Sequence, residues 1–167
     1  HEAVPDEFLD RVFAVMALCP QHIFQILTKR PKRMQTYSQD IADGLTCGLS
    51  SAWANLRPMP NQNWRWPLAN VWLGVSVEYQ SIAEERIPLL LKTIAALRFV
   101  SYEPALRPVN FFSYLSGIDW VIAGGESGPH AQPTHPDWFR KCRDQCVAAG
   151  VPFFFKQWGG WIYTDHI

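Results

Sequence analysis

Charged side chains that can transfer protons or neutralise a bound anion follow directly on short apolar runs of this 167-residue chain. Five residues share this placement: Lys29, Glu78, Glu103, Glu126 and Lys156. Ligands of α/β barrels and open α/β sheets bind at the carboxyl ends of parallel strands. If the apolar runs are such strands, these side chains reach one rim and are the first candidates for a site.

Glycines follow the fourth apolar run, in the sequence Gly124-Gly125-Glu126-Ser127. Consecutive glycines after a buried strand let the backbone approach a ligand closely, and their N–H groups can form an anion-binding nest. The alternative is a tight turn from strand to loop. We predict a cofactor-binding role for five residues of the rim: Lys29, Glu78, Gly124, Gly125 and Ser127.

Three carboxylates on one rim would repel one another and shift their pKa values, which suits acid/base catalysis or metal binding. The alternative is that Lys29, Arg30 and Lys156 neutralise the glutamates in a structural network. We predict that Glu103, Glu126 and Lys156 are catalytic and face one cavity. Lys29 is expected near the wall of this cavity.

No metal site is predicted. Imidazole is a common metal ligand, but His130 and His135 lie in a proline-containing stretch and not on one helical face. Cys142 and Cys146 are one helical turn apart on an apolar stripe, which favours core packing. Four scattered cysteines are too few for a disulfide scaffold, and we expect a reducing compartment.

The five apolar runs are short and continuous, as expected of strands buried on both faces in a parallel sheet covered by helices. They are Ile23–Leu27, Val71–Val75, Leu97–Val100, Trp120–Ala123 and Val151–Phe155. Helical periodicity predicts helices over Asp6–Leu18 and Pro136–Ala149. A third helix is expected to start at a capping box formed by Ser81 and Glu84 and to break at Pro88.

Strands that alternate with helices indicate parallel β-α-β units, and a closed eight-stranded barrel typically needs about 250 residues. The predicted fold is therefore α/β, a partial (β/α) TIM-like barrel of about five parallel strands with flanking helices. Residues 1–167 are expected to form a single domain, the carboxyl-terminal part of such a barrel, with an excursion loop over about 44–69. The apolar stripe of the leading helix predicts an earlier strand upstream of His1.

Composition argues against two classes of partner. Lys and Arg number 15 and Asp and Glu number 15, so no net field draws the protein to nucleic acid or to an anionic membrane. No apolar run approaches the roughly 20 residues that span a bilayer, and the chain does not start with a signal peptide. We therefore expect a cytoplasmic protein without a membrane partner.

Five strings of residues carry a resemblance to a known family. They are Leu27–Pro31, Asn70–Glu78, Arg86–Leu91, Asp119–Gly128 and Pro152–Gly159. Over nearly the whole chain the sequence resembles an uncharacterised bacteriophage and prophage family related to the radical S-adenosylmethionine enzymes. The resemblance implies a barrel whose cluster-binding segment is absent from this chain, which then holds no cofactor. It also implies S-adenosylmethionine and a [4Fe–4S] cluster in a full-length relative, in a bacterium or a phage-infected host.

Three functional hypotheses stay open. In the first, the chain is the carboxyl-terminal barrel portion of a phage-associated radical S-adenosylmethionine-like protein, and this portion is inactive without the missing iron–sulfur segment. The second is an acid/base barrel enzyme such as a glycoside hydrolase, with Glu103 and Glu126 as paired carboxylates. The third is a non-enzymatic phage or nucleic-acid-associated module, favoured by the basic stretch Lys29–Arg33 and opposed by the zero net charge. The substrate is an unknown small molecule or nucleic acid, and open sheet edges predict self-association.

Overall fold

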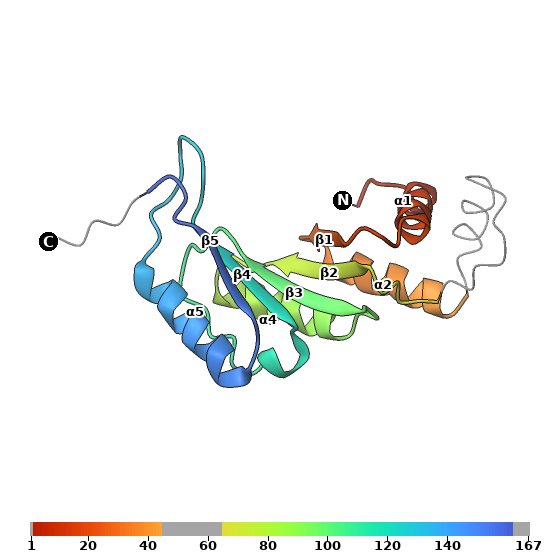
Figure 1. Ribbon diagram of the computed structural model, residues 1–167. Helices are drawn as coiled ribbons and strands as arrows, with labels where there is room; N and C mark the ends of the chain where they lie inside the picture. Colours follow the sequence, from red (N-terminus) through yellow and green to blue (C-terminus); the bar gives the residue numbers. More distant parts are fainter. Residues whose placement is uncertain (1, 45–64, 162–167) are drawn as a thin grey trace, which may run out of the picture.

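The computed structural model describes residues 2–44 and 65–161, along which helices and strands alternate (Figure 1). The elements are, in order, α1 (Asp6–Leu18), β1 (Phe24–Thr28), α2 (Pro31–Ala42), β2 (Val71–Ser76), α4 (Gln80–Leu91), β3 (Leu97–Tyr102), the 3-10 helix η1 (Leu115–Gly117), β4 (Trp120–Gly124), α5 (Pro136–Ala149) and β5 (Phe153–Gln157). Each predicted strand is present within two residues of its expected bounds, and α1 and α5 have the predicted bounds.

The five strands form one sheet in which every neighbouring pair is parallel and the order is β1-β2-β3-β4-β5. A doubly wound sheet would reverse its strand order at a switch point and carry helices on both faces. Here the order does not reverse, and α2, α4 and α5 lie on one face (Figure 1). The protein therefore has the predicted α/β fold, with the architecture of a partial (β/α) barrel.

The larger core cluster lies between the sheet and the helices α4 and α5. Alternate strand residues point into it, and Val75, Val100 and Val121 are fully buried there. They pack with Ile87 of α4 and Phe139 of α5. Burial of these apolar side chains, at roughly 25 cal/mol per Å², holds the helices on this face.

A second cluster packs α1 onto α2 near β1. Phe13 of α1 contacts Tyr37 of α2 with ring centroids 5.3 Å apart, and Trp66 at 5.6 Å. The Tyr37 hydroxyl donates a hydrogen bond of 2.8 Å to Asp10, and burial together with this bond raises the pKa of Tyr37 above its usual range. Trp66 belongs to the predicted excursion loop, most of which, residues 45–64, lies outside the described residues.

The opposite face of the sheet carries none of the described helices, and the register aligns its side chains in layers across neighbouring strands. The register places Leu27, Gly74, Phe99 and Trp120 in one layer. The next layer toward the carboxyl ends holds Ser76, Ser101, Ile122 and Phe154. Two residues further along the chain, Lys156 lies on β5, and Glu78 and Glu103 lie just beyond the ends of β2 and β3. This face therefore grades from an apolar floor to a charged rim.

Helix α4 differs from its predicted form at both ends. It begins at Gln80, so Ser81 lies inside the first turn, and Glu84 accepts a 2.9 Å hydrogen bond from the Gln80 side chain instead of completing a capping box. It also continues through Pro88, because the fully buried Ile87 and Leu90 hold the last turn against the sheet. None of the described helices has the length and apolar character needed to cross a membrane.

Candidate functional site

An ion pair joins the ends of β3 and β5 at the charged rim. The Lys156 ammonium lies 3.1 Å from one carboxylate oxygen of Glu103. Strand β4 runs between these strands, and a β-carbon on its Gly124 would lie 3.1 Å from the other Glu103 oxygen, so glycine leaves room for the pair. The Glu103 side chain is 19% exposed and that of Lys156 52%, so the ammonium is the more accessible partner.

Gln157, which is not among the predicted site residues, fixes the orientation of Glu103. Its side-chain amide donates hydrogen bonds of 3.1 Å to Glu103 and 2.9 Å to Ser127. Strict alternation along β5 would turn consecutive residues to opposite faces. An irregularity of the β4–β5 ladder beside Gly124 lets both Lys156 and Gln157 reach the same carboxylate. A sequence shows no signal for such a shift.

The ion pair of Glu103 and Lys156 (the rim pair) stands over a cavity of about 380 Å³ on the open face of the sheet. Its lining residues are Gln25, Leu27, Phe99, Ser101, Glu103, Trp120, Ile122, Phe154 and Lys156. Both edge strands contribute side chains, so this face is concave. Gly74 of β2 helps to form the floor, because a β-carbon there would lie 2.6 Å from the Phe99 ring.

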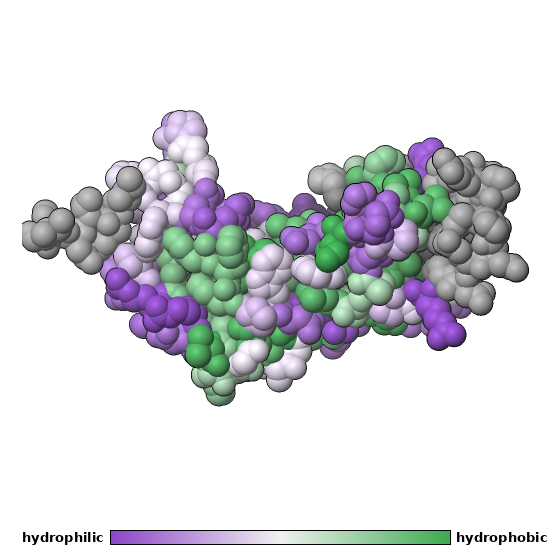
Figure 2. All heavy atoms as spheres, in the orientation of Figure 1, coloured by the Kyte–Doolittle hydropathy of each residue, from purple (hydrophilic) through white to green (hydrophobic). Residues whose placement is uncertain are grey.

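Aromatic rings form much of the cavity floor and of one side. Trp120 contacts Phe99 and Phe154 with ring centroids 6.1 and 6.5 Å apart, and Trp72 at 6.0 Å. Phe154 is 51% exposed and Leu27 is 47% exposed. Figure 2 shows apolar surface at the β5 end of the molecule, next to the hydrophilic surface of α5. Exposed rings beside a polar pair are typical of a ligand cavity.

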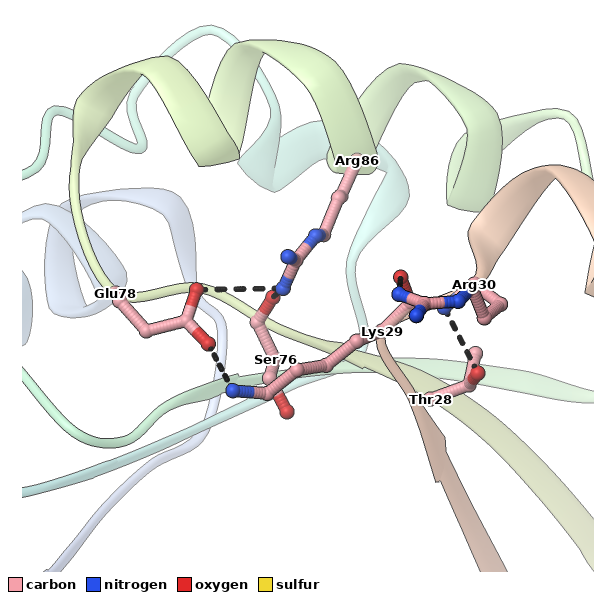
Figure 3. A network of polar contacts seen from close by, with 6 residues as sticks. All are labelled: Thr28, Lys29, Arg30, Ser76, Glu78 and Arg86. Carbon is pink, nitrogen blue, oxygen red and sulfur yellow. Dashed lines mark hydrogen bonds and ion pairs between the residues drawn. The ribbon is translucent and has the colours of Figure 1, made fainter. Parts of the chain in front are cut away.

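A second ion network lies at the ends of β1 and β2 (Figure 3). The Lys29 ammonium lies 2.7 Å from one oxygen of Glu78, and Arg86 of α4 lies 3.2 Å from the other. Arg86 also donates a hydrogen bond of 2.9 Å to the Ser76 carbonyl. The side chains of Glu78 and Arg86 are 8% and 11% exposed, so this pair is buried while Lys29 reaches solvent. The predicted residues Lys29 and Glu78 therefore meet, with Arg86 as an additional partner.

The prediction that one cavity holds all the catalytic candidates is wrong for Glu126. Lys29, which was expected near the wall of that cavity, follows the lining residue Leu27 by two positions and pairs with Glu78. A carboxylate oxygen of Glu126 accepts a 2.8 Å hydrogen bond from the Gln132 backbone N–H, so this side chain turns into its own loop. Strand direction decides where a residue leaves the sheet, but nearby N–H groups of a polar loop attract its carboxylate.

The glycines after β4 bring two loops together. The Gly125 N–H donates a hydrogen bond of 2.9 Å to the Gln157 carbonyl, and the Gly160 N–H donates one of 2.7 Å to the Glu126 carbonyl. These loops project together beyond the carboxyl ends of β4 and β5 (Figure 1). The N–H of Gly125 is thus bonded inside the chain, as the tight-turn alternative expects. The cofactor-binding role of the glycines and Ser127 stays a prediction.

The basic stretch Lys29–Arg33 is largely neutralised within the chain. Arg33 lies 2.7 Å from Asp6, and Arg30 lies 3.6 Å from Glu2. With Lys29 paired to Glu78, three of the four cations of this stretch have acidic partners. Little of its charge is left for a phosphate backbone.

The described residues do not fit a [4Fe–4S] cluster. Cys142 and Cys146 are fully buried, and a hydrogen bond with Cys146 together with burial raises the pKa of the Cys142 thiol. Cys19 follows α1 at the amino-terminal side of β1, away from the rim, and Cys47 lies outside the described residues. Among residues 2–44 and 65–161, no group of three or more His, Cys, Asp or Glu side chains is placed to hold a metal ion.

Residues 1–166 match the protein family described as "Protein of unknown function (DUF5131)". The match includes every described element from α1 to β5. No curated protein and no solved structure matches the chain.

Proposed function

The chain belongs to the DUF5131 family, and we propose that it forms the carboxyl-terminal barrel portion of a phage-associated, radical S-adenosylmethionine-like protein. The sheet is the observation that carries this proposal. Its five parallel strands follow one another in chain order, with helices on one face and, on the other, layers that end in a charged rim. In a (β/α) barrel that second face is the interior, and its carboxyl end is where substrates bind.

In this proposal the concave face is the substrate wall of the barrel. Glu103 and Lys156 contact the substrate at the rim, where a carboxylate can accept a proton and an ammonium can donate one. Gln157 is a positioning residue, because it contacts Glu103 and holds the carboxylate in place. The Lys29–Glu78–Arg86 network fixes the neighbouring strand ends. The described cysteines do not meet at the rim, because Cys142 and Cys146 are buried in the core between the sheet and the helices.

The described contacts give less support to the two alternatives. Glycoside hydrolysis needs two carboxyl groups that face one substrate at a separation of about 5–9.5 Å. Glu126 instead bonds to Gln132 and does not line the cavity of Glu103. A nucleic-acid module needs a basic surface, and the cations of Lys29–Arg33 are mostly paired with acids.

Iron and sulfide analysis of the protein at its natural length, purified without oxygen, tests the proposal. We expect bound iron in that protein and none in residues 1–167 alone. The natural-length protein without iron, or stoichiometric iron in residues 1–167, would overturn the proposal. The proposal also assigns the protein to the cytoplasm of a bacterium or of a phage-infected host.

A further inference from the structure

We propose that the concave cavity binds the flat ring of a nucleobase with a lactam edge, the edge that guanine carries. A lactam edge places a carbonyl oxygen beside a ring N–H group. This inference rests on the proposed function only in taking the concave face as the substrate cavity. It concerns the identity of the ligand, and it needs no cluster.

The aromatic part of the cavity suits the faces of a heterocycle. Phe154 is 51% exposed and stands beside Trp120, with ring centroids 6.5 Å apart. Leu27, at the opposite edge of the same cavity, is 47% exposed. Exposed aromatic rings of this kind stack with bases, whose two faces are apolar.

The rim pair suits the edge of the same ring. A carboxylate has about four lone-pair sites, and Glu103 uses two of them for Lys156 and Gln157. Lys156 has three N–H donors and uses one of them for Glu103. An acceptor and a donor therefore stand side by side. The carboxylate can accept the ring N–H of a lactam while the ammonium donates to its carbonyl oxygen.

The two parts are spaced for a single ring. Phe154 and Lys156 lie two positions apart on the same face of β5, which is about 6.6–6.8 Å along a strand. A purine stacked on Phe154 thus reaches the rim pair with its edge. The inner face of β1 adds the amide of Gln25, and β3 adds the hydroxyl of Ser101, as further hydrogen-bonding groups in the cavity.

A nucleobase can come from a free nucleoside or from a nucleic-acid strand. The net charge is zero, and the basic stretch beside β1 is mostly neutralised. Strand binding draws much of its affinity from phosphate contacts. The free nucleoside is therefore the source that the charges favour.

Calorimetric titration of the natural-length protein with guanosine, adenosine and ribose tests the inference. We expect saturable guanosine binding, at least fivefold weaker binding of adenosine, which lacks the lactam edge, and no binding of ribose. An oligonucleotide with one guanine among adenines distinguishes the sources. Binding of guanosine at least as tight as that of the oligonucleotide assigns a free nucleoside, and much tighter oligonucleotide binding assigns a strand.

Three variants locate the binding. Phe154→Leu keeps an apolar side chain but removes the ring, and should weaken guanosine binding about tenfold. Glu103→Gln should bring guanosine close to adenosine in affinity. The matched control is Phe112→Leu, because Phe112 is 68% exposed and lies outside the cavity lining. It should bind guanosine like the unaltered protein.

Absence of saturable guanosine binding, equal binding of guanosine and adenosine, or unchanged binding in Phe154→Leu would overturn the inference. Its outcome is separate from that of the proposed function. Iron content is measured on the same purified protein and does not depend on nucleoside binding. Iron without guanosine binding rejects only the nucleobase, and guanosine binding without iron rejects only the radical S-adenosylmethionine-like assignment.

Discussion

Gly125 lies so close to the backbone of Trp158 that a β-carbon at position 125 would stand 1.9 Å from the Trp158 carbonyl oxygen. This contact joins the loop after β4 to the loop after β5. Because the obstructing atom belongs to the backbone, a side chain at this position cannot be accommodated by a rotamer change. The hydrogen bond from Gly125 to Gln157 depends on the same approach.

Gly125→Ala should therefore destabilise the protein by at least about 2 kcal/mol, a large value for overpacking. Gly124→Ala is the matched control, because its β-carbon would meet the Glu103 side chain at 3.1 Å, which can shift, and the Gln157 carbonyl oxygen at 3.4 Å, which is an ordinary van der Waals distance. We expect it to cost less than about 1.5 kcal/mol. Urea unfolding of both variants measures the difference. Equal costs would show that the two loops can separate without loss of stability.

Glu78 should be the member of its network on which stability depends. Glu78→Gln leaves Arg86, whose side chain is 11% exposed, without its charged partner. Removing one partner of a buried ion pair costs about 3–5 kcal/mol. Lys29→Met removes a cation that is 55% exposed and should cost no more than about 1 kcal/mol. Similar unfolding free energies for the two variants would contradict this ranking.

Tyr37→Phe should lower stability in a manner that depends on pH. At about pH 8 it leaves the buried Asp10 without its tyrosine donor, at a cost of about 1–3 kcal/mol. Burial and the bond to Asp10 raise the pKa of Tyr37 in the folded protein, so its contribution is complete below about pH 10 and is lost as the pH rises toward the folded-state pKa.

The free-energy difference between the unaltered protein and Tyr37→Phe should accordingly shrink above about pH 10. Urea unfolding at several pH values measures it. Tyr79→Phe, at a position 38% exposed, is the control and should change stability little at about pH 8. A free-energy difference between the unaltered protein and Tyr37→Phe that grows with pH would contradict the predicted direction of the pH dependence.

The two edge strands should make residues 1–167 associate when they are studied alone. β1 and β5 end the described sheet on either side, and open edges offer backbone groups to other strands. Sedimentation at several concentrations should show concentration-dependent association. Ile23→Lys, at a position 59% exposed just before β1, should weaken it by placing a charge at one edge. A monomer at every concentration would mean that both edges are covered.

The sequence determines the strands, two of the helices and the direction of the sheet. Continuous apolar runs indicate parallel strands, and here one face of the strands packs on helices while the other forms the apolar cavity floor, so all five strands were predictable. Helix α5 ends where expected because Gly150 adopts φ 70°, a left-handed conformation that glycine accepts without strain. The extent of helix α4 was harder to predict, because tertiary burial of Ile87 and Leu90 outweighs the helix-breaking effect of Pro88.

Only the tertiary structure decided which rim residues meet. Strand order brings candidate side chains to one rim, but a hydrogen bond depends on side-chain reach and on groups from loops and helices far along the chain. Glu103 pairs with Lys156 across Gly124 of β4, and Glu78 pairs with Arg86 of α4. Glu126 instead accepts a hydrogen bond from its own loop. The concave aromatic face was equally hidden in the sequence. A run that is apolar at every position does not show which alternate residues face the helices, and that was fixed only when the helices packed on one face.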